Sequence, residues 1–356
     1  MKVCLLSYNH KPYIGGIETY SNELQKFMLS KNIKHKIICG KFVKFKFIRI
    51  IEVILRFYLN IVSKNYDIVH LTSLNLWPVL FINKLSNKHL IFIVNLHGLE
   101  LMYGERKKLL SRLYNFLLPI NYINNQDNIH FLCNSIQTME LAEKKFFKNK
   151  LHFIPMGVKK VLDTDTTKNI NKNHLFYIGR IVERKGVSWF CDNVLIHFKD
   201  TKLFFAGPII DKDEFNKINS NPQTQYMGII SEEHKLMMIQ QSLATVIPNI
   251  TNLSSADFEG FGISLLEIVA LGGLPIATKS QGIITSSLDG KIGITVREES
   301  PDEWKEQIKI LQTSKLEFRS TLIAENQILV RKNFLWNDIF KLTIEHYMKL
   351  LEKSEN

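Results

Sequence analysis

The amino-acid sequence predicts an α/β protein with two doubly wound parallel sheets in series. Short apolar runs alternate with amphipathic segments along the first half, and the alternation restarts after a polar stretch at 159–173. Strand–helix–strand alternation is typical of a parallel sheet with helices on both faces. A length of 356 residues also suits two domains better than one.

The first half contains six candidate strands and four candidate helices. Short apolar runs bounded by polar residues predict the strands, at 2–8, 35–40, 67–73, 89–98, 129–135 and 151–158. The amphipathic segments predict helices at 18–31, 45–63, 106–118 and 136–147. We therefore expect an N-terminal Rossmann-like domain over residues 1–158, on the acceptor side of the molecule.

The second half repeats the pattern after the polar linker. Strands are expected at 174–180, 202–208, 224–230, 244–250 and 274–280, and helices at 186–198, 231–242 and 262–272. Beyond Glu298 the chain is predicted to be helical to its end. We expect a C-terminal Rossmann-like domain over 159–335 and a separate last helix over 336–356.

Composition limits the partners without choosing one. The formal charge of +12 favours acidic partners, namely nucleic acid, an anionic membrane surface or phosphorylated small molecules. A genome biased toward Lys would give the same excess of cations. The charge therefore has to be interpreted together with the motifs.

The four cysteines indicate a reducing compartment. They are widely spaced, contain no CxxC pair and mostly fall in apolar runs, which favours small core residues over disulfides or zinc ligands: Cys4, Cys39, Cys133 and Cys191. The apolar run after Lys2 is too short for a signal peptide, and no stretch reaches the ~18 apolar residues of a membrane span. We expect a cytoplasmic protein.

Two loops at the expected strand ends of the first half carry candidate ligand contacts. Ligands of open parallel sheets bind beyond the carboxyl ends of the strands. Gly15 and Gly16 precede a helix there, so backbone can approach an anion closely, although a plain tight turn gives the same pattern. His97 and Glu100 follow the fourth strand, and a histidine can exchange a proton near neutral pH. A lone histidine in this position is more often structural.

Two cations follow the first strand of the second half. Arg180 lies at the strand end, and Lys185 lies five residues later, before a glycine and a helix. A guanidinium fork and an ammonium on one turn suit a diphosphate. A solvated basic loop is the alternative interpretation.

The segment 258–275 combines glycines, a buried helix and two acids. Its glycines leave the backbone N–H groups of Phe261, Gly262 and Ile263 free to meet a phosphate. Apolar residues cover most of the helix that follows, so Glu267 lies on a buried element, where an unpaired carboxylate is costly. Glu259 precedes the helix and is expected to be more open. Glu267 therefore needs a cation or a ligand hydroxyl.

These motifs together resemble glycosyltransferase family 4. That family contains retaining enzymes of the GT-B fold, in which two Rossmann-like domains face a cleft. The resemblance covers nearly the whole chain and rests on four motifs in order: the Gly-Gly-x-Glu loop at 15–18, His97-Gly98, Gly179-Arg180 with Lys185-Gly186, and Glu259-x7-Glu267.

The resemblance implies how a nucleotide-diphosphate sugar, with a UDP-sugar favoured, is bound. Gly16 would lie against the donor, Arg180 and Lys185 would hold the diphosphate, and Glu267 would bind the ribose hydroxyls. Meeting the charge of the leaving group with cations and a helix dipole would replace a metal ion. We therefore expect no cofactor besides the donor itself.

The resemblance also implies contacts with the transferred sugar. Glu259 would bind its hydroxyls, and His97 would contact it and help at the reaction centre. Similar enzymes return their last helix across the first domain, and the aromatic, amphipathic stretch 333–351 suits that course. The segment 280–290 lacks the acid that the family often has there, and 249–257 is unusually long, so the identity of the sugar stays open.

Other interpretations remain. A metal-dependent transferase would use Asp-x-Asp, found at 163–165 in the linker and at 211–213, where acids opening a helix complement its dipole. A nucleotide-sugar epimerase or hydrolase of the same fold would share the donor motifs.

A basic membrane-surface or nucleic-acid binder is a further alternative. Its support is the segment 41–64, which is basic and aromatic at helical spacing and suits anionic lipid. No nucleic-acid-binding motif accompanies it. Combining these interpretations, we expect a metal-independent, retaining hexosyltransferase-type enzyme of bacterial surface polysaccharide biosynthesis. Its acceptor would be a glycan or a lipid-linked saccharide, and its basic face would hold it near an anionic membrane.

Overall fold

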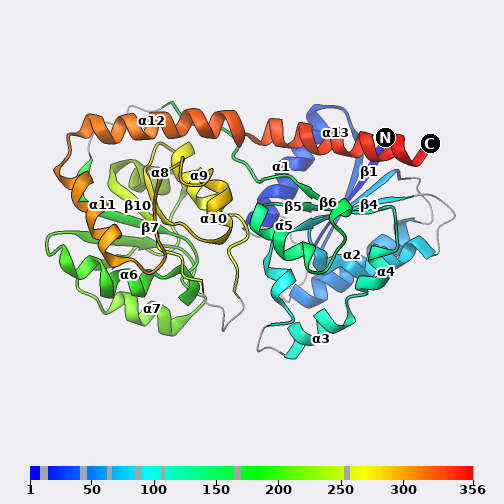
Figure 1. Cartoon of the computed structure of the whole chain (residues 1–356), viewed down its shortest axis with the longest axis horizontal. Helices are drawn as coiled ribbons and strands as arrows, with labels where there is room; N and C mark the ends of the chain where they lie inside the picture. The colour runs from blue at the N-terminus through cyan, green and yellow to red at the C-terminus, as the bar shows by residue number, and fades with distance from the viewer. Residues whose placement is uncertain are drawn as a thin grey trace. The chain divides into compact units, whose positions relative to one another are not determined.

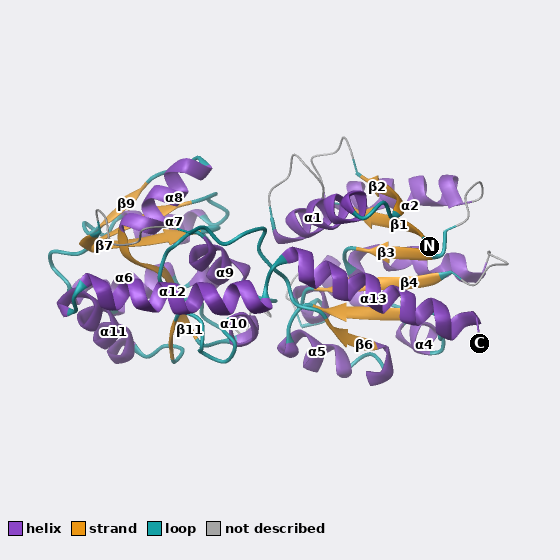
Figure 2. Ribbon diagram, turned by 90° about the horizontal axis from the view of Figure 1, so that it is seen from above, coloured by secondary structure: helices purple, strands orange, loops and turns teal. Residues whose placement is uncertain are grey.

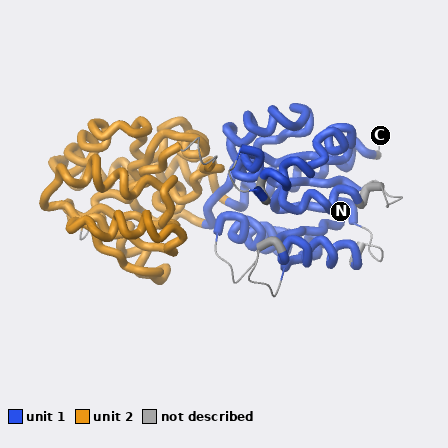
Figure 3. Tube along the Cα trace, turned by 90° about the horizontal axis from the view of Figure 1, so that it is seen from below, with its two compact units in different colours: residues 1–159, 336–356 blue, residues 160–335 orange. Residues whose placement is uncertain are grey.

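The computed structural model describes residues 1–8, 15–40, 46–61, 66–84, 90–105, 109–163, 170–251 and 257–355. The chain (Figure 1) forms two compact units. Unit 1 contains Met1–Lys159 together with Trp336–Asn356, and unit 2 contains Lys160–Leu335 (Figure 3). The last helix of the chain therefore belongs to the same unit as the first strand.

Unit 1 contains a six-stranded parallel sheet in the order β2-β1-β3-β4-β5-β6. The strands are β1 (Lys2–Ser7), β2 (Lys34–Cys39), β3 (Ile68–Leu71), β4 (Ile91–Leu96), β5 (Ile129–Cys133) and β6 (Leu151–Phe153). Strands β3, β4 and β5 are short apolar runs that the sheet buries, as expected for a sheet covered on both faces. Strand β2 lies on one side of β1, and β3 and the later strands lie on the other side. The carboxyl ends of β1 and β3 therefore form a topological switch point.

Helices cover both faces of the unit 1 sheet (Figure 2). They are α1 (Gly16–Ser30), α2 (Lys46–Ile61), α3 (Leu109–Leu117), α4 (Ile120–Asn124), α5 (Ile136–Glu143) and α13 (Trp336–Glu355), with 3₁₀ helices η1 (Leu74–Lys84), η2 (Leu99–Met102) and η3 (Lys148–Lys150). Helix α13 packs on α1, where Tyr20 meets the rings of Trp336 and Phe340 edge-on at 5.9 and 5.5 Å. Aromatic packing therefore attaches the end of the chain to unit 1.

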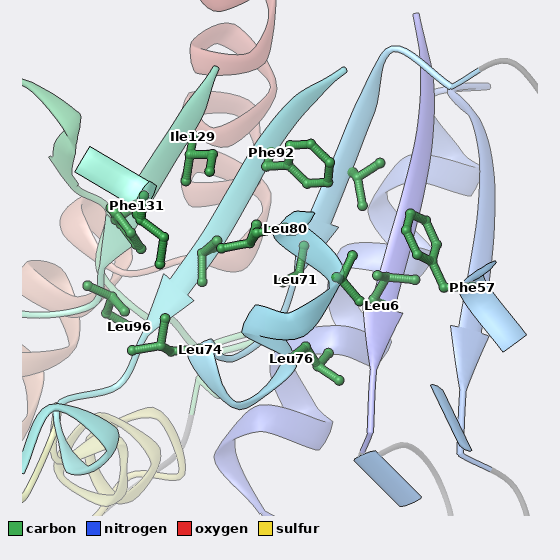
Figure 4. Packing of buried hydrophobic residues seen from close by; sticks show 14 of the residues in the cluster. Leu6, Phe57, Leu71, Leu74, Leu76, Leu80, Phe92, Leu96, Ile129 and Phe131 are labelled. Carbon is green, nitrogen blue, oxygen red and sulfur yellow. The ribbon is translucent and has the colours of Figure 1, made fainter. Parts of the chain in front are cut away.

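One hydrophobic core cluster of unit 1 combines side chains of the sheet with side chains of α2 and η1. Leu6, Phe57, Leu71 and Phe92 are among its fully buried side chains, and Figure 4 shows them converging from strands and helices. Burying each such side chain contributes about 1.5–3 kcal/mol relative to leaving it exposed. The sheet and its helices are thus one hydrophobic unit rather than separate elements.

Unit 2 contains a second six-stranded parallel sheet, in the order β12-β11-β10-β7-β8-β9. Its strands are β7 (Asn171–Ile178), β8 (Lys202–Ala206), β9 (Thr224–Tyr226), β10 (Ser242–Ile247), β11 (Pro275–Thr278) and β12 (Ile294–Val296). Here the chain reverses between β7 and β10. The loops that follow these two strands are therefore the expected ligand edge.

The helices of unit 2 also lie on both sides of its sheet (Figure 1). They are α6 (Val187–Asn193), α7 (Lys212–Asn219), α8 (Glu232–Gln241), α9 (Ile263–Ala270), α10 (Gln281–Ser286), α11 (Pro301–Thr313) and α12 (Leu316–Asn333), with η4 (Glu183–Lys185) and η5 (Leu195–His197). Trp304 of α11 is fully buried and packs on Phe190 of α6 at 5.1 Å. This contact seals one face of the sheet.

The structure confirms the eleven predicted strands and adds one. The added strand is β12, in a segment for which the sequence analysis predicted no element. The strand predicted at 224–230 ends at Tyr226, and the one at 151–158 ends at Phe153. The helix predicted at 186–198 is broken at Val194 into α6 and η5. No described helix is long and apolar enough to cross a bilayer.

The cysteines and one Asp-x-Asp pair have the structural roles that the sequence favoured. Cys4, Cys133 and Cys191 are buried, Cys39 is half-buried, and all four are free thiols. The Asp211 carboxylate caps α7 by accepting hydrogen bonds from two backbone N–H groups, including that of Asp213.

Candidate functional site

The switch point of unit 2 is built on a turn that cannot easily move. Strand β7 continues into η4, and the backbone N–H of Ile250, after β10, donates to the carbonyl of Arg184 at 3.0 Å. Gly186 ends the turn with φ +64°, and a Cβ there would lie 2.0 Å from the carbonyl oxygen of Pro248. Only glycine tolerates both conditions. The cations of this turn are therefore presented by fixed backbone.

Glu259 lies where the two loops of the switch point meet. Its Oε2 atom accepts hydrogen bonds from Arg184 Nη1 and Lys185 Nζ, both at 2.6 Å, and from Asn249 Nδ2 at 3.3 Å. The side chains of Arg184 and Lys185 are only 12% exposed, and that of Glu259 is 17% exposed. The expectation that Glu259 would be more open is therefore wrong, because these ion pairs enclose its carboxylate. Charge-assisted bonds of this length and burial are among the strong ones in proteins.

Burial and ion pairing set the protonation of this cluster. Burial lowers the pKa of Lys185 to about 8, even though the Glu259 carboxylate beside it opposes the shift. Burial alone would raise the pKa of Glu259, but Lys185 and Arg184 outweigh it and hold that pKa well below its usual range. For Arg184, likewise, the Glu259 carboxylate outweighs burial and raises the pKa. At neutral pH, which lies below the pKa of Lys185, most Lys185 side chains are protonated. Arg184, Lys185 and Glu259 are then all charged.

Arg180 occupies a more open place at the end of β7. Its carbonyl accepts a hydrogen bond from the Tyr177 hydroxyl at 2.8 Å, which fixes the backbone. Its side chain is exposed, and the described part of the chain gives its guanidinium no hydrogen bond or ion pair. Arg180 is therefore available to a ligand without breaking a protein contact.

Helix α9 begins beside this cluster, as predicted. Gly262 is its N-cap with φ +77°, and a Cβ there would lie 2.7 Å from the Ile283 side chain. The carbonyl and N–H of Glu259 bond to the N–H of Gly282 and the side-chain oxygen of Gln281, respectively. The start of α10 thus supports the approach to α9. The first N–H groups of α9, at Ile263 and beyond, lack partners within the helix.

Glu267 is half-buried on the otherwise buried helix α9. Burial raises the pKa of its carboxyl, and the ammonium of Lys235 on α8 partly offsets that shift. The described residues offer its carboxylate no hydrogen bond. This is the situation that the sequence predicted for a carboxylate completed by a ligand hydroxyl.

The predicted residues of unit 1 gather around a small pocket. His97 follows β4, and its Nε2 lies 2.9 Å from the carbonyl oxygen of Thr72. It lines the pocket together with Tyr20, Asn134 and Met156. Asn134 is 6% exposed, and its side-chain oxygen has no partner in the described part of the chain. Hydroxyl groups are suitable ligands for such a lining.

The glycine pair of unit 1 lies at the N-terminus of α1, next to this pocket. Gly15 is the N-cap and Gly16 the first helical residue. A Cβ on Gly16 would lie 3.7 Å from the methyl group of Met156, which lines the pocket. Residues 9–14, which precede the pair, lie outside the described residues.

The structure thus groups the predicted residues by unit. In unit 2, Lys185 and Glu259 are in contact. Gly262 caps α9, Ile263 and Glu267 lie on that helix, and Phe261 directly precedes the cap. Gly15, Gly16 and His97 group in unit 1. Sequence analysis missed Arg184, which is adjacent to Lys185 but outside the motif. Only its charge in the run Glu183-Arg184-Lys185 hinted at a role.

The chain resembles known proteins in sequence. Residues 159–327 match the family model of glycosyl transferases group 1. An uncharacterized glycosyltransferase of Methanocaldococcus jannaschii is 26% identical over 359 residues, covering 94% of this chain and 95% of that protein.

Two solved structures show the same fold over the whole chain. Sucrose-phosphate synthase from Thermosynechococcus elongatus has a TM-score of 0.79 at 15% identity, covering 99% of each chain. Anabaena HepE in complex with UDP-glucose has a TM-score of 0.68 at 14% identity, covering 98% of this chain and all of that one. These matches confirm the GT-B fold that the sequence predicted, with its two parallel α/β units. The match to the family model covers most of the C-terminal unit, and the comparisons support a glycosyltransferase.

Proposed function

We propose that the protein is a retaining glycosyltransferase of family 4. It would transfer a hexose from a nucleotide-diphosphate sugar, a UDP-sugar by preference, to a glycan or lipid-linked saccharide. The observation that carries this proposal is the cation cluster at the unit 2 switch point, next to the N-terminus of α9. Cations and oriented N–H groups are what a departing nucleoside diphosphate requires.

In this proposal, different residues bind the diphosphate and the ribose of the donor. Arg180, Lys185 and the first N–H groups of α9 hold the diphosphate and neutralise its charge as it leaves, so no metal ion is needed. Glu267, whose carboxylate is not satisfied by the protein, binds the ribose hydroxyls. Support for such a donor comes from HepE, whose structure contains UDP-glucose.

The sugar is met by Glu259 and by groups of unit 1. Glu259 binds its hydroxyls, and His97 contacts it at the reaction centre. The neutral lining beside His97 supports this role, since Asn134 offers a buried, unpartnered oxygen to a hydroxyl group. Retention is attributed to front-face attack, without a committed protein nucleophile.

We further propose a cytoplasmic enzyme of bacterial surface polysaccharide assembly that works at an anionic membrane surface. Helix α2 exposes Ile48, Ile51, Leu55 and Leu59 on one stripe, within the basic segment that the sequence indicated. Exposed apolar side chains in a basic region suit the lipid interface. Sedimentation with anionic and neutral vesicles at low salt tests this, and failure to bind anionic vesicles would leave α2 as scaffold only.

The donor is identified by a thermal-shift panel of UDP-, GDP- and ADP-sugars. A specific donor at 100 times its Kd should stabilise the protein by about 2.7 kcal/mol, whereas no shift at millimolar levels with any donor would refute the proposal. Product analysis with and without acceptor then separates transfer from the hydrolase or epimerase alternative. Loss of transfer in EDTA with recovery in Mn²⁺ would contradict metal independence.

A further inference from the structure

The cations of the unit 2 site are already occupied by a carboxylate of the protein. Arg184 and Lys185 both bond the same atom, Glu259 Oε2, at 2.6 Å. A diphosphate that binds these two cations would have to share them with Glu259 or replace it. The protein therefore places a carboxylate of its own where the proposed ligand would place a phosphate oxygen.

The charges of the site favour replacement. Arg180, Arg184 and Lys185 are cationic, whereas Glu259 and Asp257 are the anions that act on the two guanidinium groups. Three cations against two anions leave an excess of one positive charge. A diphosphate carries more negative charge than one carboxylate, so it is the stronger partner for two buried cations.

We propose that Glu259 is an internal stand-in for the diphosphate, and that Arg184 is a donor-binding residue alongside Lys185. When the donor binds, Arg184 and Lys185 transfer from the Glu259 carboxylate to the phosphate oxygens. The released carboxylate then becomes free to accept hydrogen bonds from the hydroxyls of the sugar. This inference rests on the proposed function and adds Arg184 and the exchange to it.

The geometry allows this exchange without moving the backbone. The carbonyl of Arg184 is held by the N–H of Ile250 at 3.0 Å, and the N–H of Lys185 bonds the carbonyl of Val182 at 2.9 Å. Only the side chains have to turn. A guanidinium can bind two oxygens of a phosphate side by side, which a single carboxylate oxygen does not offer.

The exchange is tested by calorimetric titration of the full-length protein with inorganic pyrophosphate and with UDP. Arg184→Gln should weaken the binding of both ligands about 10-fold, since a charge-assisted hydrogen bond to the phosphate is lost. Arg184→Lys should recover part of the loss because it restores the charge. Arg331→Gln is the matched control, because Arg331 also pairs with a carboxylate of unit 2, that of Asp163, and should change affinity less than about 2-fold.

Glu259→Gln separates exchange from a merely structural ion pair. With the competing charge removed, pyrophosphate and UDP should bind about 3- to 10-fold tighter, even though the empty variant melts at a lower temperature than wild type. Glu259→Asp, whose shorter side chain reaches the cations less well, should shift affinity in the same direction and serves if the glutamine variant does not fold. Equal or weaker binding in both variants would overturn the exchange.

The wild-type protein and the Arg331→Gln variant distinguish a failure of the proposed exchange from a failure of the proposed function. If wild type binds neither pyrophosphate nor any nucleotide, the proposed function itself fails. If wild type binds both ligands and Arg184→Gln behaves like Arg331→Gln, only the role of Arg184 is wrong.

Discussion

The candidate sites of the two units use opposite chemistry. In unit 2 the ligand edge contains buried charges that are paired with one another through Glu259. In unit 1 the pocket that His97 lines has largely apolar walls with a few polar groups such as Asn134. A site for a charged ligand has to balance its own charges while it is empty, whereas a site for hydroxyl groups has only to leave a few polar atoms unsatisfied.

The largest expected effect separates the two sites by their kinetic role. His97→Ala should lower kcat/KM by about 100-fold, because it removes a group at the reaction centre. It should leave the affinity for UDP unchanged, since the nucleotide is assigned to unit 2. Steady-state kinetics and calorimetry measure the two quantities. His35→Ala removes another histidine of unit 1 that bonds a backbone carbonyl and should change neither; a loss of UDP affinity in His97→Ala would erase the distinction.

The second effect concerns the rigid backbone of the unit 2 site. Gly262→Ala should destabilise the protein by about 1–3 kcal/mol, because a side chain at φ +77° is strained and would also meet Ile283 at 2.7 Å. Gly228 has a similar φ of +74° with nothing within 4 Å of its Cβ. Gly228→Ala should therefore show the strain alone. Denaturant titration compares the two, and equal losses would mean that the fit of α9 against α10 contributes nothing.

The third prediction tests whether Glu267 binds the nucleotide. Glu267→Ala should weaken binding of bare UDP about 10-fold, since an acceptor of the ribose hydroxyls is lost. The matched change Glu325→Ala removes an exposed carboxylate of α12 in the same unit and should be silent. An unchanged UDP affinity in Glu267→Ala, measured by calorimetry, would leave the raised pKa of this carboxyl without a functional meaning.

The smallest expected effect is a pH dependence of the affinity for UDP. Only the unit 2 site, with its buried charges, should show it. Lys185 has a pKa of about 8, so it is charged at pH 7 and neutral at pH 9. Affinity for UDP should fall across this range by up to about 10-fold. The variant Lys185→Arg, which does not titrate here, should give a flat profile.

The stability of the empty protein should move the other way with pH. The pKa of Lys185 in the folded state lies below its ordinary value of 10.5, so folding releases a proton between these two pH values. The contribution of Lys185 to stability therefore rises from about pH 8 to 10.5. If the affinity for UDP and the free energy of unfolding both fell above pH 8, a group other than Lys185 would be responsible.

The sequence was sufficient to predict the two sheets, and it proposed the motif residues at their edges, for physical reasons. Buried parallel strands such as 91–96 are continuous apolar runs, and ligand residues follow them at a fixed edge. The contact between Arg184 and Glu259 could not be predicted in this way, because 75 positions separate the two residues and only the closing of the sheet brings them together. The same holds for Asn134, whose unpartnered oxygen depends on packing around Met156.

The division of the chain into units has a consequence for how the protein is made. Unit 2 is one continuous segment, whereas unit 1 is completed only by residues from Trp336 onward. On the ribosome, the surface that receives Trp336, Phe340 and Tyr347 stays uncovered until α13 emerges. Unit 2 can therefore finish folding first, although it is synthesised second. Removing helix α13 would therefore damage unit 1, although most of unit 1 lies far from α13 in the sequence. The same truncation would leave unit 2 intact.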